Sequence, residues 1–179
     1  MRLVASDIDG TILGHDGKIS DRTVRAFHAC REAGVELVFV TGRPPRWLRP
    51  LHDRLGHTGT VICSNGAVVW DLEEDRLVSA RALQLDAVFE ARRIIQRLRP
   101  SALFAAETLN GFHLEPGFIE NGSSELLAEV SPAPLHNTLA ATDSVVKFSS
   151  APGAAAGEGA WTIATMMNAM TTRRIASSR

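Results

Sequence analysis

Leu3-Val4-Ala5-Ser6-Asp7-Ile8-Asp9-Gly10-Thr11 is the stretch of the chain that decides its fold. It begins with three apolar residues and ends in two aspartates and a glycine. Short apolar runs of this kind are typical of strands buried in a parallel sheet, and the polar residues then lie at the carboxyl end of the strand. We therefore expect a strand near the amino terminus, with a functional site where that strand ends.

The residues that follow predict a β-α-β unit. Ser20 can cap a helix that runs to about Ala33, and residues 35–40 (VELVFV) read as a second buried strand. This strand also ends in a polar turn, Thr41-Gly42-Arg43. Because a unit of this length favours a parallel pair with a right-handed crossover, we expect the Asp7 end and the turn to lie side by side.

A third strand and a third polar turn come next. Pro44 and Pro45 can open another helix, and residues 61–63 then form a strand that ends in Ser64-Asn65-Gly66. Open α/β sheets bind ligands at the carboxyl ends of their strands, so the three turns predict one site. Residues 68–70 and 77–80 look like a hairpin that leaves the main sheet.

The pattern changes after residue 80. Helical spacing runs from residue 86 to 98, and short strands are expected at 102–106, 112–114 and 145–148. This alternation is typical of an α+β insertion.

We therefore predict an α/β fold with three parts. Residues 1–80 form the first part of a Rossmann-like parallel sheet core, which we expect to be incomplete, and residues 81–148 form an inserted α+β cap. Residues 149–179 are an atypical tail, which we expect to be either disordered or, after a flexible linker, a terminal helix at about residues 161–170.

Composition favours a small-molecule enzyme over other classes. The chain has 179 residues, of which 45% are hydrophobic, so it can bury a core. A net charge of −1 gives no basic footprint for nucleic acid, and no run reaches the ~20 apolar residues that a membrane span needs. Cys30 and Cys63 lack the spacing of a metal or disulfide site. We expect a soluble cytoplasmic protein, and the sequence indicates no oligomeric state.

Three motifs stand at the expected strand ends: DIDGT at residues 7–11, TGR at 41–43 and SNGA at 64–67. With the large insertion after them, they make the chain resemble the haloacid dehalogenase-like superfamily, and in detail its Cof-type sugar-phosphatase branch. The resemblance covers roughly residues 1–148. It implies hydrolysis of phosphomonoesters, on sugar phosphates or similar small metabolites, through an aspartyl-phosphate intermediate.

The resemblance also implies roles for individual residues. Asp7 would be the nucleophile, and Asp9 the general acid that protonates the leaving alcohol and then the base that activates water. Mg²⁺ is the implied cofactor, held by the Asp7 carboxylate and the Asp9 backbone carbonyl, because a hard cation between two carboxylates offsets their repulsion. Backbone N–H groups near Gly10 and the Thr41 hydroxyl would hold the phosphoryl oxygens, and Gly42 and Arg43 of the same turn are the other candidates for binding phosphate.

Several of these residues have a second interpretation. Arg43, in the same turn as Gly42, either reaches the phosphate or extends along the surface. Asn65 and Gly66 form either a substrate-side loop or a plain turn. An isolated pair of aspartates can simply cap a turn, and a receiver-type signalling domain also carries acids at a strand end, although it has no cap insertion.

Two later motifs of the family are absent from the sequence. Relatives carry a lysine that neutralises the phosphorylated aspartate and a GDxxND turn that completes the magnesium shell. Here lysine occurs only at Lys18 and Lys147, Lys147 lies in an expected cap strand, and no aspartate follows Asp143. We hypothesise a shift of reading frame near residue 149. The alternative function is a catalytically inactive, truncated fragment that keeps a phosphate-binding cradle, with an open sheet edge and exposed apolar surface.

Overall fold

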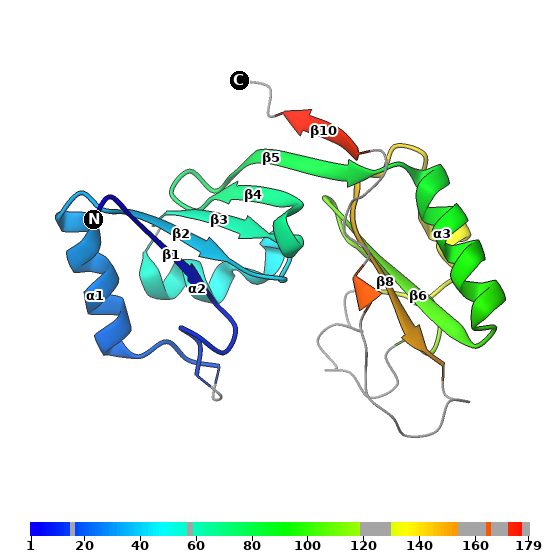
Figure 1. Cartoon of the computed structure of the whole chain (residues 1–179), viewed down its shortest axis with the longest axis horizontal. Coiled ribbons are helices and arrows are strands. Elements are labelled where there is room, and N and C mark those ends of the chain that lie inside the picture. Colours follow the sequence, from blue (N-terminus) through cyan, green and yellow to red (C-terminus); the bar gives the residue numbers. More distant parts are fainter. Residues whose placement is uncertain (15–16, 57–58, 119–129, 154–163, 166–171, 177–179) are drawn as a thin grey trace. The chain divides into compact units, whose positions relative to one another are not determined.

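A computed structural model describes residues 1–14, 17–56, 59–118, 130–153, 164–165 and 172–176. The chain divides into two units (Figure 1). Unit 1 comprises Met1–Ala80 with Arg174–Arg179, and unit 2 comprises Arg81–Arg173. The domain limits expected from the sequence, at residues 80 and 148, remain a prediction.

Unit 1 contains the first part of the sheet, with strand order β1-β2-β3-β4-β5. Strands β1, β2 and β3 are parallel, with Asp7 beside Val40 in the register, so the two expected strand ends lie side by side. Its elements are β1 (Leu3–Asp7), α1 (Asp21–Glu32), β2 (Glu36–Val40), η1 (Pro45–Trp47), α2 (Arg49–Leu55), β3 (Thr60–Cys63), η2 (Ser64–Gly66), β4 (Val68–Asp71) and β5 (Arg76–Leu83).

The expectation that β4 and β5 leave the main sheet is wrong. β4 pairs antiparallel with β3 over its whole length, from Cys63 beside Val68 to Thr60 beside Asp71. The physical reason is the tight turn at residues 64–66, which sends the chain straight back along the strand it has just left. The buried Val68 then packs beside the buried Cys63 in the same sheet.

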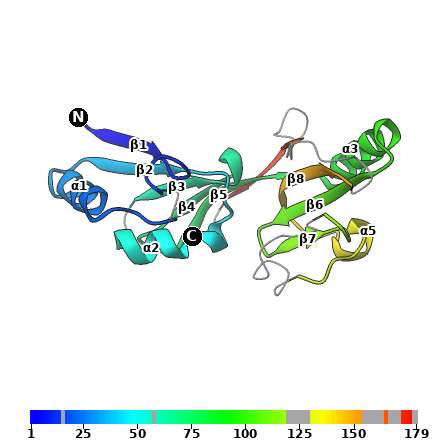
Figure 2. The same cartoon turned by 90° about the horizontal axis from the view of Figure 1, so that it is seen from below.

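Helices α1 and α2 lie on one face of the unit 1 sheet (Figure 2). The Ser20 hydroxyl caps α1 as expected, because it accepts a hydrogen bond from the Thr23 N–H at 3.1 Å. The Phe27 ring of α1 meets Phe39 of β2 edge-on, with ring centroids 5.2 Å apart. The helix expected after Pro44 begins as the 3₁₀ turn η1, and Trp47 at the end of this turn is 37% exposed.

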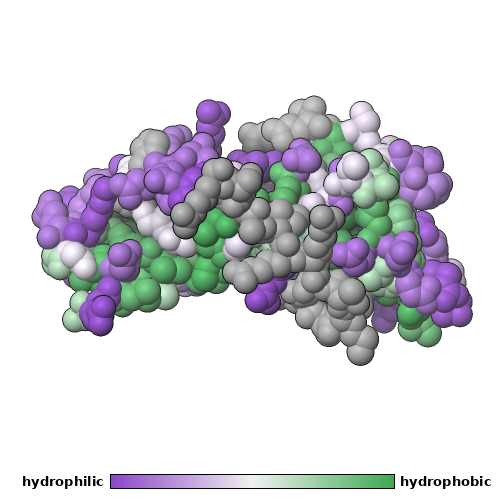
Figure 3. All heavy atoms as spheres, turned by 90° about the horizontal axis from the view of Figure 1, so that it is seen from above, coloured by the Kyte–Doolittle hydropathy of each residue, from purple (hydrophilic) through white to green (hydrophobic). Residues whose placement is uncertain are grey.

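The other face of the unit 1 sheet is covered by none of the described helices. Leu3 of β1 is 52% exposed, and Val40, which registers beside Asp7, is 36% exposed. Figure 3 shows such hydrophobic atoms at the surface of unit 1. Parallel strands are normally covered on both faces, so an uncovered face with exposed apolar side chains is unusual for them.

Unit 2 contains strands β8, β6 and β7, which continue the strand order after β5, and helix α3 lies on one face of these strands (Figure 2). In it β8 pairs antiparallel with β6, β6 pairs antiparallel with β7, and Leu83 at the end of β5 pairs with Val145. The rings of Phe104 and Phe148 stack at 5.6 Å in its core. Its elements are α3 (Leu85–Leu98), β6 (Ala102–Thr108), β7 (Phe112–Leu114), α5 (Leu135–Thr138), β8 (Val145–Pro152) and β9 (Ala164–Thr165).

The tail expected at residues 149–179 lies largely outside the described residues. β8 continues to Pro152, four residues beyond the strand expected at residues 145–148. Of the helix expected at about residues 161–170, only Ala164 and Thr165 are described, and they form β9 because their extended backbone pairs with β8. Strand β10 (Thr172–Ala176) pairs with β5. Among the described residues, no helix is long and apolar enough to cross a membrane.

Candidate functional site

The turn after β1 is built around one buried side chain. Ile8 is only 1% exposed, its N–H donates to the Val40 carbonyl at 3.1 Å, and its own carbonyl accepts the Leu13 N–H at 3.0 Å. Asp7 and Asp9 flank this anchor, and both are exposed. The alternation of the chain through Ile8 therefore presents both carboxylates at the end of the strand, as the DIDGT pattern predicts.

Asp9 is held by two residues of the turn after β2. The Thr41 hydroxyl donates to Asp9 Oδ2 at 2.9 Å. Arg43 donates to Asp9 Oδ1 through Nε at 2.9 Å and through Nη2 at 2.7 Å. The Arg43 N–H in turn donates to the Thr41 hydroxyl oxygen at 3.0 Å. Both carboxylate oxygens of Asp9 are therefore engaged.

The carboxylate of Asp7, unlike that of Asp9, has no bonding partner among the described side chains. Among the described residues, no side chain bonds its carboxylate, and only its backbone carbonyl accepts a hydrogen bond, from the Ser6 hydroxyl at 3.0 Å. The two neighbouring acids thus differ chemically, because Asp9 is fixed by a guanidinium and a hydroxyl while the Asp7 carboxylate is available to a ligand.

The turn after β3 packs against the turn after β2. The Ser64 N–H donates to the Arg43 carbonyl at 2.9 Å, and the Asn65 N–H donates to the Thr41 carbonyl at 3.3 Å. Ser64 and Asn65 both adopt positive φ, 49° and 56°, which is uncommon for residues other than glycine. The structure therefore brings the residues from 41 to 43 and Asn65 together beside Asp9.

Sequence reasoning expected Thr41 and Arg43 to meet a phosphate. In the structure their side chains meet Asp9, and the phosphate-binding role stays a prediction. Gly10 (φ 76°) and Gly66 (φ 92°) occupy turn positions that need the left-handed region. Asp9 lies two residues beyond Asp7, and the parallel register of β1 and β2 therefore brings it level with the turn at residues 41–43. This position is the one sequence signal that could have indicated the partners of Asp9.

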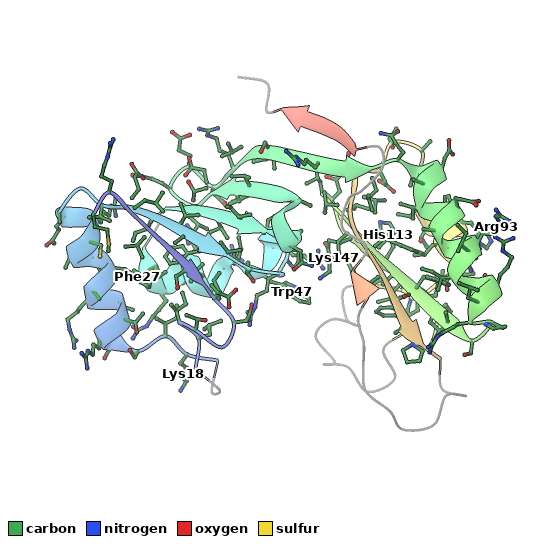
Figure 4. The ribbon with its side chains drawn as sticks, in the orientation of Figure 1. Lys18, Phe27, Trp47, Arg93, His113 and Lys147 are labelled. Atoms are coloured by element: carbon green, nitrogen blue, oxygen red, sulfur yellow. The ribbon has the colours of Figure 1, made fainter. Side chains whose placement is uncertain are left out.

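The residues offer part of a magnesium site. The Asp7 carboxylate and the Asp9 backbone carbonyl are oxygen donors of the kind that Mg²⁺ takes, and water or substrate oxygens commonly fill its other positions. Within the described part of the chain, no group of three His, Cys, Asp or Glu side chains gathers around one point. Lys18 lies in the segment between β1 and α1, and Lys147 lies in β8 of unit 2 (Figure 4).

The family model for haloacid dehalogenase-like hydrolases matches residues 4–138. The chain belongs to this family. The match covers most of the described residues of both units, and it confirms the resemblance and the α/β fold class predicted from the sequence.

Individual haloacid dehalogenase-like relatives match over shorter stretches. Pyridoxal phosphate phosphatase YbhA from Escherichia coli (strain K12) is 34% identical over 90 residues, which is 47% of this chain and 33% of the relative. An HMP-PP phosphatase from Yersinia pestis (strain Pestoides F) is 41% identical over 76 residues, 42% of this chain and 28% of the relative. The matched segment thus spans about a third of these relatives.

Solved structures of the family share the fold. A haloacid dehalogenase-like hydrolase from B. subtilis superposes with a TM-score of 0.68 at 18% identity, covering 84% of this chain and 61% of that one. The likeness extends over far more of this chain than the sequence matches do, so unit 2 shares in the family fold.

Proposed function

We propose that this chain carries the nucleophile and the acid-base residue of a magnesium-dependent phosphomonoester hydrolase. The observation that carries the proposal is the contrast between two neighbouring carboxylates. Asp7 is exposed and unbonded by the described side chains, and Asp9 is fixed by Thr41 and Arg43. Membership in a family whose matched relatives are named as phosphatases supports the same reaction.

The reaction has two displacements. In the first, an Asp7 oxygen forms a bond to phosphorus while the bond from phosphorus to the leaving alcohol oxygen breaks, and Asp9 gives that oxygen a proton. In the second, Asp9 takes a proton from water, the water oxygen bonds to phosphorus, and the Asp7 carboxylate leaves. Arg43 and Thr41 keep the Asp9 carboxylate in one orientation through both steps.

Magnesium would be held by the Asp7 carboxylate and the Asp9 backbone carbonyl. When bound, it supplies positive charge that offsets the charge of the phosphoryl group. Backbone N–H groups near Gly10 would bind phosphoryl oxygens, since the N–H groups of a tight turn are suited to anions.

The proposed substrate is a small phosphorylated metabolite, a sugar phosphate or a compound of similar size. Support comes from the names of the relatives, which describe pyridoxal phosphate and HMP-PP as their substrates. Residues 81–148 would act as a cap that selects the substrate and excludes water. Such a substrate agrees with a cytoplasmic location and requires neither nucleic acid nor membrane.

The alternative is an inactive domain that keeps only a phosphate-binding cradle. One observation favours it: the Thr41 hydroxyl and the Arg43 guanidinium, both expected to bind phosphate, are engaged with Asp9.

Release of inorganic phosphate separates the two functions. The substrates are p-nitrophenyl phosphate and a panel of sugar phosphates and other phosphorylated metabolites, each with magnesium and with a chelator. The hydrolase proposal expects magnesium-dependent turnover that is lost in Asp7→Asn and kept in the matched control Asp53→Asn, whose side chain is exposed. No turnover from a folded preparation would refute it and favour the inactive domain.

A further inference from the structure

Gly42 lies against the side chain of Asn65, and its backbone conformation does not itself require glycine. Its φ lies outside the left-handed region, so a larger residue could adopt its backbone. A Cβ added at Gly42 would lie 2.7 Å from Oδ1 of Asn65, well inside van der Waals contact. The Asn65 side chain therefore occupies the place that a side chain at position 42 would take.

Backbone hydrogen bonds close the same contact on both sides. Asn65 donates its N–H to the carbonyl of Thr41, and Ser64 donates its N–H to the carbonyl of Arg43. The turn after β3 is thus hydrogen-bonded to the residues immediately before and after Gly42, and the side-chain amide of Asn65 lies against Gly42.

The turn after β3, residues 64–66, has an unfavourable backbone conformation. Two successive residues, Ser64 and Asn65, adopt positive φ, which is unfavourable for residues other than glycine. Ser64 is buried and, among the described residues, its hydroxyl has no hydrogen-bond partner. Strain of this kind persists only where the surroundings fix the conformation, and it clusters at functional sites.

The turn after β2, residues 41–43, carries both side chains that bond Asp9. The Thr41 hydroxyl and the Arg43 guanidinium stand on either side of Gly42, and together they bond both oxygens of the Asp9 carboxylate. A displacement of this turn by about 1 Å would separate both donors from Asp9, and misplacement on that scale can cost ~100-fold in rate.

We propose that Asn65 is a positioning residue: by filling the space over Gly42 it fixes the Thr41–Arg43 turn, and through that turn the Asp9 carboxylate. The effect on turnover rests on the proposed hydrolase function, whereas the effect on the ion pair between Arg43 and Asp9 does not. The proposal differs from a substrate-side role for Asn65, because here its amide acts through the protein.

The side-chain Nε–H signal of Arg43 in a ¹H–¹⁵N spectrum tests the ion pair directly, since a hydrogen-bonded guanidinium N–H exchanges slowly with water. The variants are Asn65→Gly, which removes the amide and suits the positive φ at this position, Gly42→Ala, and the two combined. Asn110→Ala, at an exposed position in unit 2, is the matched control. Backbone amide signals of β1 and β2 establish that each variant is folded.

We expect each single variant to lose the Arg43 signal and the control to keep it. Without the Asn65 side chain, a Cβ at position 42 has room. The effects of the two substitutions should therefore not add up, and the double variant should resemble Asn65→Gly alone. An Arg43 signal that persists in folded Asn65→Gly would overturn the proposal. A double variant more strongly disturbed than Asn65→Gly alone would also overturn it. If Gly42→Ala fails to fold, the comparison of Asn65→Gly with the control decides; if Asn65→Gly fails to fold, Asn65→Ser, which shortens the same side chain, is measured in its place.

Turnover gives a second readout. If the chain hydrolyses phosphomonoesters, Asn65→Gly should lower kcat by roughly 10- to 100-fold and leave KM within about twofold. A raised KM with unchanged kcat would instead assign Asn65 to substrate binding and contradict the positioning role. Absence of turnover in the unmodified protein would refute the hydrolase function, while the Arg43 signal would still decide the positioning role.

Discussion

Truncation of Ile8 should destabilise unit 1 and disturb the aspartate turn together. The side chain is 1% exposed, and its deletion in Ile8→Ala leaves a cavity where the chain passes from β1 into the turn. Buried isoleucine-to-alanine changes cost about 2–5 kcal/mol, and Ile8→Val should cost about 0.5–1.5 kcal/mol. For a domain of ordinary stability, 5–15 kcal/mol, the larger change removes a substantial fraction of the total.

Urea unfolding followed by tryptophan fluorescence measures the effect. With a slope of about 2 kcal/mol per molar urea, Ile8→Ala should lower the midpoint by about 1.5 M and Ile8→Val by about 0.5 M. Leu3→Ala removes the same number of carbon atoms from β1 at a residue that is 52% exposed, so it is the matched control and should move the midpoint little. Equal shifts for Ile8→Ala and Leu3→Ala would refute the reasoning that Ile8 anchors this turn.

Three further predictions concern other parts of the chain. Arg92→Met should destabilise unit 2 by roughly 3–5 kcal/mol, because it removes the guanidinium that lies 2.8 Å from the buried Glu115 carboxylate; Arg92→Met with Glu115→Leu should recover most of the loss in urea unfolding, and an unaffected single variant would contradict this. Burial raises the pKa of the Cys63 thiol to about 12, so native Cys63 should resist iodoacetamide at pH 8 while the half-buried Cys30 reacts; the folded protein should also lose stability as the pH rises above about 9, since the unfolded thiol ionises first. Leu3→Lys should reduce binding of a hydrophobic dye and self-association at the uncovered face of the unit 1 sheet, and unchanged dye binding would show that this face is covered in solution.

Local patterns predicted the helices and strands because their signals are local. Ser20 marked the start of α1 by its capping hydroxyl. The alternation of strand and helix up to residue 63 predicted the parallel order β1-β2-β3 for the same reason.

Strand partners were harder to predict than the strands themselves. The residues of β4 and β5 were recognised as a hairpin, but an apolar strand pairs equally well inside or outside the main sheet, and the sequence does not name its neighbour. The same limit applies to β9 and β10, whose pairing with β8 and β5 joins residues far apart in the chain.

The candidate site could be predicted by position but not by contact. The motifs placed Asp7, Asp9 and the turn containing Thr41 at one edge of the sheet, and the structure places them there. The bond from Arg43 to Asp9 spans 34 positions and depends on rotamers that no spacing rule encodes. The contact of Asn65 with Gly42 is likewise invisible in the sequence, where both residues look like ordinary turn formers.

Direct detection of a phosphorylated Asp7 tests the central claim most closely. The protein is incubated with magnesium and p-nitrophenyl phosphate, quenched in acid and digested, and the peptide that carries Asp7 is examined by mass spectrometry, with Asp7→Asn treated in parallel. A phosphoryl group on Asp7 that is absent from the variant and from samples with chelator is the result we predict. Phosphate release without any acyl-phosphate on Asp7, or labelling that persists in Asp7→Asn, would contradict the assignment of Asp7 as the nucleophile.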